Sequence, residues 1–295
     1  MRHAITLSSF GLGTTSPNPP VGCVILDRHG AVVGVGYHRR KGEPHAEVHA
    51  LRAAGAAARG GTAVVTLEPC NHVGVTPACR QALIDARIAR VVVSVIDPTS
   101  RGDGGAAVLA AHGIDVEVDV IPDETLTVLG PWLVATHRRR PYLTWVYSSA
   151  SKDSFAVSEL LPNGLRRTAD LVAGDDSIVE GVPGGHAPAY FTVPDVPTGD
   201  LRGWLATCYA AGTRSIMLKS AQRSGNLYNN FDYVDEVLTF VERLSPSGNH
   251  GAATWPSHLG FELIDIASEG GGVWVRLRRP ISIHSPAARL PERSR

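Results

Sequence analysis

The sequence has no excess of either charge and few cysteines. Lysine plus arginine and aspartate plus glutamate both number 28 in 295 residues, and cysteine occurs 4 times. Balanced charge gives no general attraction to nucleic acid or to an anionic membrane, so we expect neither as a partner. Four cysteines fit a reducing compartment better than a disulfide framework.

Long hydrophobic runs are also missing. No apolar segment approaches the ~20 residues that span a bilayer, and the N-terminal stretch lacks the core and cleavage site of a signal peptide. We therefore expect a cytoplasmic protein. The pattern Gly-x-Gly-x-x-Gly of dinucleotide-binding folds is absent, and Gly270-Gly271-Gly272 stands between two expected strands, where a hairpin turn is a sufficient explanation.

The stretch from Pro44 to Cys79 holds the groups of a hydrolytic zinc site. Zinc favours imidazole nitrogen and thiolate sulfur, and a catalytic site keeps three protein ligands so that a fourth position can hold water. His45, Cys70 and Cys79 make that set. Glu47 is left unligated and is placed to carry protons between water and a substrate. His-x-Glu followed by Pro-Cys and a second cysteine is the signature of zinc deaminases.

A purely structural zinc site is the alternative interpretation. Such sites close with a fourth protein ligand, and the nearby candidates are Cys23, His49 and His72. Cys23 lies in an apolar run and is expected to be a small buried hydrophobe. Glu47 favours the catalytic interpretation, because a structural site has no use for a free carboxylate.

The apolar spacing predicts how these groups are positioned. Residues 48–58 have helical spacing, which places His45 and Glu47 in the first turn of a helix. Residues 63–67 indicate a buried strand that ends near the first cysteine, and residues 77–86 a helix with Cys79 in its first turn. Two helix N-termini would therefore meet at the metal, where their partial positive charge favours thiolates.

The first half of the chain alternates strands with helices. The further elements that we expect are a helix at 1–10, a loop at 15–20, strands at 21–26, 31–37, 90–96 and 114–118, and helices at 106–111 and 123–136. This alternation predicts one α/β sheet with helices on both faces, in a domain spanning residues 1–137.

The second half predicts a separate α/β domain over residues 141–281. Arg138, Arg139 and Arg140 indicate a solvated linker at the junction. Between 157 and 198, rich in proline and glycine, only 177–180 suggests a strand. The other expected elements are strands at 142–147, 215–218 and 234–244, a helix at 201–211, and a hairpin of 261–266 with 273–277. Residues 282–295 are expected to be a disordered tail.

Several motifs together resemble a known family. They are Thr15-Ser16-Pro17-Asn18-Pro19, Gly36-Tyr37-His38, residues 44–51, residues 66–72 and Thr76-Pro77-Ala78-Cys79, with eight residues between the two cysteines. From about Arg2 to Leu133 the chain resembles the deaminase half of the bifunctional riboflavin-biosynthesis deaminase-reductase. Most cytidine and tRNA deaminases separate these cysteines by only two residues.

The resemblance implies a cytidine-deaminase-like α/β/α sandwich with one zinc ion per chain. It also implies hydrolytic removal of an exocyclic amine from a small molecule, a diaminopyrimidinone ribosylamine phosphate. Matched by position, Asn18, His38, His72 and Asp97 line the pyrimidine pocket. A homodimer or a higher homo-oligomer is expected. After Asp97-Pro98, however, Thr99-Ser100 replaces the family's Asn-Pro near the sugar phosphate.

The second half departs further. Residues 140–144 match the opening strand of the family's reductase domain, which is similar to dihydrofolate reductase, and Asp235-Glu236 also matches. Val146, however, stands where the family has a lysine, and Lys219-Ser220-Ala221 stands where it has Glu-Gly-Gly. Side chains thus fill the space that glycines leave for a cofactor phosphate. We expect a shortened, degenerate reductase domain that does not bind NADPH.

Four functions follow as hypotheses. The first is a zinc deaminase of a riboflavin-pathway pyrimidine whose C-terminal domain serves dimerisation or substrate enclosure. The second keeps both activities and needs NADPH. The third is a deaminase of a related pyrimidine or pterin-like amine in specialised metabolism. The fourth, a non-catalytic zinc-stabilised interaction protein, is disfavoured by Glu47.

Overall fold

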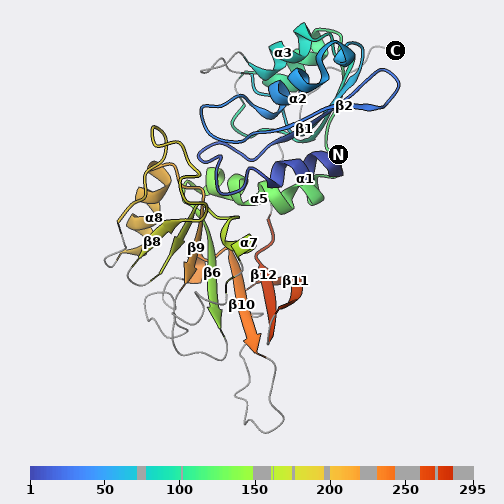
Figure 1. Ribbon diagram of the computed structural model, residues 1–295. Coiled ribbons are helices and arrows are strands. Elements are labelled where there is room, and N and C mark those ends of the chain that lie inside the picture. The colour runs from blue at the N-terminus through green and yellow to red at the C-terminus, as the bar shows by residue number, and fades with distance from the viewer. Residues whose placement is uncertain are drawn as a thin grey trace. The chain divides into compact units, whose positions relative to one another are not determined.

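The structure, a computed structural model, forms two compact units, Met1–Gly130 and Pro131–Ser282 (Figure 1). The described residues are 1–71, 78–100, 102–148, 161, 163–174, 177–195, 200–219, 231–242, 260–269 and 272–281. The expected tail at 282–295 therefore lies outside them, as do His72 and Ser220-Ala221. Each unit is built on a β-sheet of its own.

The N-terminal unit alternates strands and helices as the sequence predicts. Its elements are α1 (Arg2–Ser9), β1 (Gly22–Leu26), β2 (Val32–Tyr37), α2 (Ala46–Ala54), η1 (Gly55–Ala58), β3 (Thr62–Leu67), α3 (Cys79–Asp85), β4 (Arg90–Val95), α4 (Gly104–Ala111), β5 (Asp115–Glu117) and the start of α5 (Pro122–Arg138). The strand order is β2-β1-β3-β4-β5, in which β3, β4 and β5 are parallel and β1 runs antiparallel to both of its neighbours.

Helices cover both faces of this sheet. On one face, Cys23 and Ile25 of β1 pack with Ala46 and Ala50 of α2. On the other face, Val24 packs with Ala4 of α1. Side chains of successive strand residues point to opposite faces, so one strand serves both layers. Figure 1 shows α1 and α2 on opposite sides of the sheet, and the predicted α/β/α sandwich is confirmed.

Two glycines of β2 let α2 approach the sheet closely. A Cβ added at Gly34 would lie 2.2 Å from the carbonyl oxygen of Ala50, and one at Gly36 would lie 2.4 Å from that of Ala46. Any side chain at these positions would push the helix outward. The sequence predicts helical spacing over residues 48–58, but the observed helix α2 ends at Ala54. Gly55 has φ 55° and ends the helix, and the short helical turn η1 follows.

The C-terminal unit contains a seven-stranded sheet in the order β11-β12-β10-β6-β9-β7-β8. Its elements are β6 (Tyr142–Ser148), α7 (Asn163–Arg166), β7 (Leu171–Ala173), β8 (Ile178–Glu180), α8 (Leu201–Ala210), β9 (Ser215–Lys219), η2 (Phe231–Tyr233), β10 (Glu236–Glu242), β11 (Glu262–Glu269) and β12 (Gly272–Arg278). The expected final hairpin is confirmed as the antiparallel pair β11 and β12. Strand β7 and helix α7 were not predicted.

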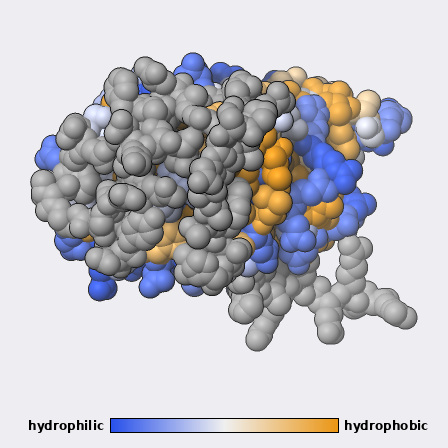
Figure 2. All heavy atoms as spheres, turned by 90° about the horizontal axis from the view of Figure 1, so that it is seen from below, coloured by the Kyte–Doolittle hydropathy of each residue, from blue (hydrophilic) through white to orange (hydrophobic). Residues whose placement is uncertain are grey.

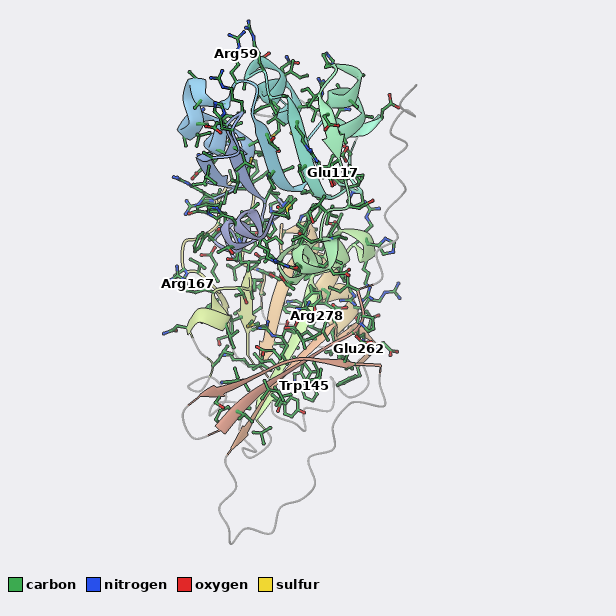
Figure 3. The ribbon with its side chains drawn as sticks, turned by 90° about the vertical axis from the view of Figure 1, so that its right-hand side faces the viewer. Arg59, Glu117, Trp145, Arg167, Glu262 and Arg278 are labelled. Atoms are coloured by element: carbon green, nitrogen blue, oxygen red, sulfur yellow. The ribbon has the colours of Figure 1, made fainter. Side chains whose placement is uncertain are left out.

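The prediction of a solvated arginine linker holds in part, because Arg138 and Arg139 are exposed whereas Arg140 is half-buried. Arg138 donates to Oδ1 of Asp235, and Nη1 of Arg140 lies 2.7 Å from Oδ2 of the same side chain. Asp235 is 2% exposed and also accepts the backbone N–H of Leu143 at 2.9 Å. Its neighbour Glu236 accepts from Arg278 of β12, which Figure 3 labels. The pairs that Arg138, Arg140 and Arg278 make with Asp235 and Glu236 therefore help to anchor the strands of this sheet to each other.

Among the described residues, no helix has both the length and the apolar character needed to cross a membrane. Hydrophobic side chains nevertheless reach the surface, and Figure 2 shows them gathered in patches on the face that it presents. On β11, which ends the strand order of its sheet, Leu263, Ile264 and Ile266 are 58%, 46% and 56% exposed.

Candidate metal centre and active site

Three elements bring the predicted metal ligands together. His45 is the N-cap of α2, Cys70 follows the end of β3, and Cys79 is the first residue of α3. The ligand atoms of the three residues all lie within 4.8 Å of one another. Nδ1 of His45 is 3.1 Å from Sγ of Cys79, and the backbone N–H of Cys79 donates to Sγ of Cys70 at 3.2 Å.

This donor set fits a zinc ion. Tetrahedral zinc with its usual bonds to sulfur and nitrogen separates its ligand atoms by roughly 3.5 Å. A hydrogen bond from Cys79, followed by one from His45, lowers the pKa of the Cys70 thiol, which favours the thiolate form that binds zinc. Within the described residues, the group does not include Cys23 or His49. Cys23 is fully buried in β1, as the sequence predicts.

Glu47 lies in the first turn of α2, and its side chain is 3% exposed. Burial raises the pKa of this carboxyl above its ordinary value, although His45 opposes the shift. Its side chain also hydrogen-bonds Cys79, which places it beside the ligand group. A carboxyl with a raised pKa next to a metal site can both accept and return a proton.

Two of the predicted pocket residues lie together beside the metal ligands. Nδ2 of Asn18 is 3.1 Å from Nε2 of His38. The His38 ring meets the His45 ring edge-on, with ring centroids 5.1 Å apart. Burial, followed by the charge of His45, lowers the pKa of His38 to about 4, so this imidazole is neutral. Lys41, which the sequence reasoning missed, donates to Oδ1 of Asn18 at 2.8 Å.

Asp97 stands in the loop after β4, next to the end of β3. These two strands are parallel, and ligands of open α/β sheets bind at such carboxyl ends. Oδ1 of Asp97 accepts both the backbone N–H of Thr99 at 2.8 Å and its hydroxyl at 2.7 Å. The loop therefore holds Asp97 in one conformation. His72, the fourth predicted pocket residue, lies outside the described residues.

Glu68 fixes this end of the sheet, and the sequence reasoning missed it. Its side chain is 5% exposed; Oε2 accepts the N–H of Asp97 at 3.2 Å, and Oε1 accepts the N–H of Ala106 at 2.9 Å. Gly104 has φ 84°, and a Cβ there would lie 2.5 Å from Oε1. One carboxylate thus joins the segment before Cys70 to the Asp97 loop and to α4. In the sequence, the only sign of this role is that Glu68 is a single charged residue between an apolar run and a proline.

Comparisons with known proteins agree with this site. The family model for the cytidine and deoxycytidylate deaminase zinc-binding region matches residues 1–95. Diaminohydroxyphosphoribosylamino-pyrimidine deaminase of Buchnera aphidicola subsp. Acyrthosiphon pisum is 51% identical over 126 residues, 42% of this chain and 85% of that protein. Riboflavin biosynthesis protein RibD of Mycobacterium tuberculosis is 46% identical over 150 residues, 50% of this chain and 44% of that protein.

A solved structure, Acinetobacter baumannii RibD, form 1, has a TM-score of 0.73 at 24% identity and covers 94% of this chain and 97% of that one. This likeness extends the shared fold to the C-terminal unit. The chain matches 44% of the length of RibD from Mycobacterium tuberculosis and 39% of that from Escherichia coli.

The sandwich and its His-Cys-Cys donor set define the class of hydrolytic, cytidine-deaminase-like proteins. Within it, the chain belongs to the diaminohydroxyphosphoribosylaminopyrimidine deaminase family of riboflavin biosynthesis.

We expect Glu68→Gln to lower the free energy of unfolding of the N-terminal unit by about 1 to 3 kcal/mol, because an amide NH₂ would then face a buried backbone N–H that a carboxylate oxygen now accepts. Denaturant unfolding measures the change. Glu43→Gln is the matched control, since Glu43 is exposed. Equal stability of the two variants would contradict the role of Glu68.

Proposed function

We propose that this protein is a zinc-dependent hydrolytic deaminase of a riboflavin-pathway aminopyrimidine, a diaminopyrimidinone ribosylamine phosphate or a close relative. Water and the exocyclic amine react to give a carbonyl and ammonia. The observation that carries the proposal is the convergence of His45, Cys70 and Cys79 within 4.8 Å, with the 3% exposed carboxyl of Glu47 beside them.

The roles of the residues follow from this arrangement. His45, Cys70 and Cys79 would hold a zinc ion, which would supply Lewis-acid chemistry. Glu47 accepts a proton at its carboxylate as water attacks the ring carbon, and it returns a proton to the departing amine nitrogen. Asn18, His38 and Asp97 orient the pyrimidine, together with His72. Burial keeps Glu47 out of bulk water, so its proton goes to the substrate.

A related pyrimidine is the second candidate substrate, and the Asp97 loop favours it. Thr99 stands where the family has an asparagine near the sugar phosphate. Its hydroxyl donates to Oδ1 of Asp97 at 2.7 Å. The hydroxyl proton of Thr99 therefore points into the loop. A substrate phosphate would have to compete with Asp97 for this hydrogen bond.

We propose that the C-terminal unit does not transfer hydride. At the position of the family's lysine, Val146 is 0% exposed and packs with Met217 and Leu161 in an apolar cluster. Its partner in the parallel pairing of β6 with β9 is Lys219. A valine supplies no charge to a cofactor, and Lys219 alone lacks the glycine-lined approach that a phosphate needs.

In the first test, Glu47→Gln should keep zinc but lose about 10² to 10⁴ in turnover, because the amide cannot carry the proton. Zinc content and ammonia release are measured on the same preparation. Cys79→Ser is the contrast and should lose the metal as well as the activity, whereas Cys208→Ala, a change of a buried cysteine in α8, should lose neither. Normal turnover of zinc-loaded Glu47→Gln would refute the proton-transfer role.

For the C-terminal unit, titration of the purified protein with NADPH should give no saturable signal at micromolar concentrations. NADPH should also not be oxidised in the presence of deaminated product. Fluorescence of the cofactor reports binding and its absorbance reports oxidation. Saturable binding with oxidation would restore the bifunctional hypothesis.

We also propose that the protein forms a homodimer, and the apolar edge strand β11 supports this. An exposed strand edge offers backbone groups for pairing with another chain. Beyond the irregularity at Ile264, antiparallel pairing of two copies about Ile266 sets Asp265 opposite Ala267 and Ile264 opposite Ser268, so no like charges face each other. Sedimentation velocity should give a dimer, and Ile264→Lys should shift it to monomer; a monomeric wild-type protein would contradict the proposal.

A further inference from the structure

The residues that directly follow the two cysteine ligands are bonded to each other. Asn71 follows Cys70, and Arg80 follows Cys79 in the first turn of α3. Nε of Arg80 donates to Oδ1 of Asn71. The backbone N–H of Cys79 also donates to Sγ of Cys70 at 3.2 Å. Two hydrogen bonds therefore join the two ends of the eight-residue gap between the cysteines.

The chemistry of the two side chains fixes the direction of their bond. A guanidinium has donors only, so the Asn71 atom that Arg80 meets must be the amide oxygen. The amide nitrogen lies 3.8 Å from the place that a Cβ at Gly102 would occupy. Gly102 belongs to the segment between Asp97 and α4. Asn71 thus lies between α3 and the segment that follows Asp97.

This bond suits the demands of a metal site. Arg80 and Asn71 are both half-buried, which reduces competition from water, and a charged donor strengthens the hydrogen bond. A zinc ion needs its ligand atoms at fixed separations. When two ligands are separated by eight residues, bringing them together costs chain entropy. A bond between the ends of the gap offsets part of that cost before the metal arrives.

We propose that Arg80 is a positioning residue that, through Asn71, holds Cys70 at the distance from Cys79 that a metal ion requires and so raises the affinity of the site for zinc. This inference rests on the proposed zinc-dependent function. Arg80 is no ligand itself, because a guanidinium has no lone pair to offer. Groups that orient ligands without touching the metal change its affinity by about 10- to 100-fold.

The charge of Arg80 is the competing explanation, because a nearby cation favours thiolates without any hydrogen bond. Two substitutions separate the bond from the charge. In Arg80→Gln the amide nitrogen stands as many bonds from Cα as Nε of arginine does, so a donor is kept while the charge is lost. Arg80→Met has the same length, no charge and no donor. The two variants therefore differ in the donor.

The dissociation constant of zinc, measured by competition with a chromophoric chelator, tests the proposal. Arg80→Met should raise it about tenfold, and Arg80→Gln by no more than about threefold, because a donor remains. When Arg80→Met is combined with Asn71→Leu, the two effects should not multiply, since both changes remove the same bond. Arg52→Met removes an exposed charge from α2 and should leave the constant unchanged.

A spectroscopic test needs neither zinc nor turnover. In nitrogen-15 NMR of the zinc-free protein, the Nε–H of Arg80 should exchange slowly with solvent in wild type and rapidly in Asn71→Leu. The same exchange rate in both proteins overturns the proposal. Equal zinc affinity of Arg80→Gln and Arg80→Met overturns it as well, as do effects that multiply in the double variant.

Failure of the proposed function gives a different result. Wild-type protein that binds zinc but releases no ammonia would refute the deaminase, while the zinc affinities still decide the role of Arg80. Wild-type protein that binds no zinc would refute both proposals.

Discussion

The close contact of α2 with β2 is the constraint on which the site depends. Gly34 and Gly36 leave room for the carbonyls of Ala50 and Ala46, so the helix rests directly on the sheet. This contact sets the position of the helix N-terminus, where His45 meets Cys79 at 3.1 Å. A side chain at either glycine would move the helix by more than a zinc bond tolerates. The geometry of the candidate metal centre is therefore a consequence of backbone packing as much as of ligand identity.

Much of the N-terminal unit follows from its sequence, because its elements are periodic and its ligands form a compact pattern. The helices that carry His45 and Cys79 begin where apolar spacing and the preceding residues place them. Glu68 and Lys41 were missed for one physical reason. Each acts through partners distant in the chain, Ala106 for Glu68 and Asn18 for Lys41. The spacing of neighbouring residues along the chain does not predict such contacts.

The C-terminal unit was harder to predict, and its missed features explain why. Strand β7 is only Leu171–Ala173, too short to show alternation, and it lies between β9 and β8 in a buried position. The arginines before β6 resemble a solvated charge run until Asp235 is placed beside them. A buried carboxylate with two arginines holds strands together, and losing one partner would leave a charge uncompensated. Ion pairs of this kind hold the C-terminal unit together, while Val146 is buried in an apolar cluster.

We propose that the His-Cys-Cys group and Glu47 form a hydrolytic zinc site for an aminopyrimidine. The most direct measurement is ammonia release from a panel of aminopyrimidine ribosides and phosphates by protein of known zinc content. We expect one zinc per chain and ammonia release from a diaminopyrimidinone ribosylamine compound, abolished by a chelator and restored by zinc. Zinc-loaded protein that releases no ammonia from any compound of the panel would contradict it.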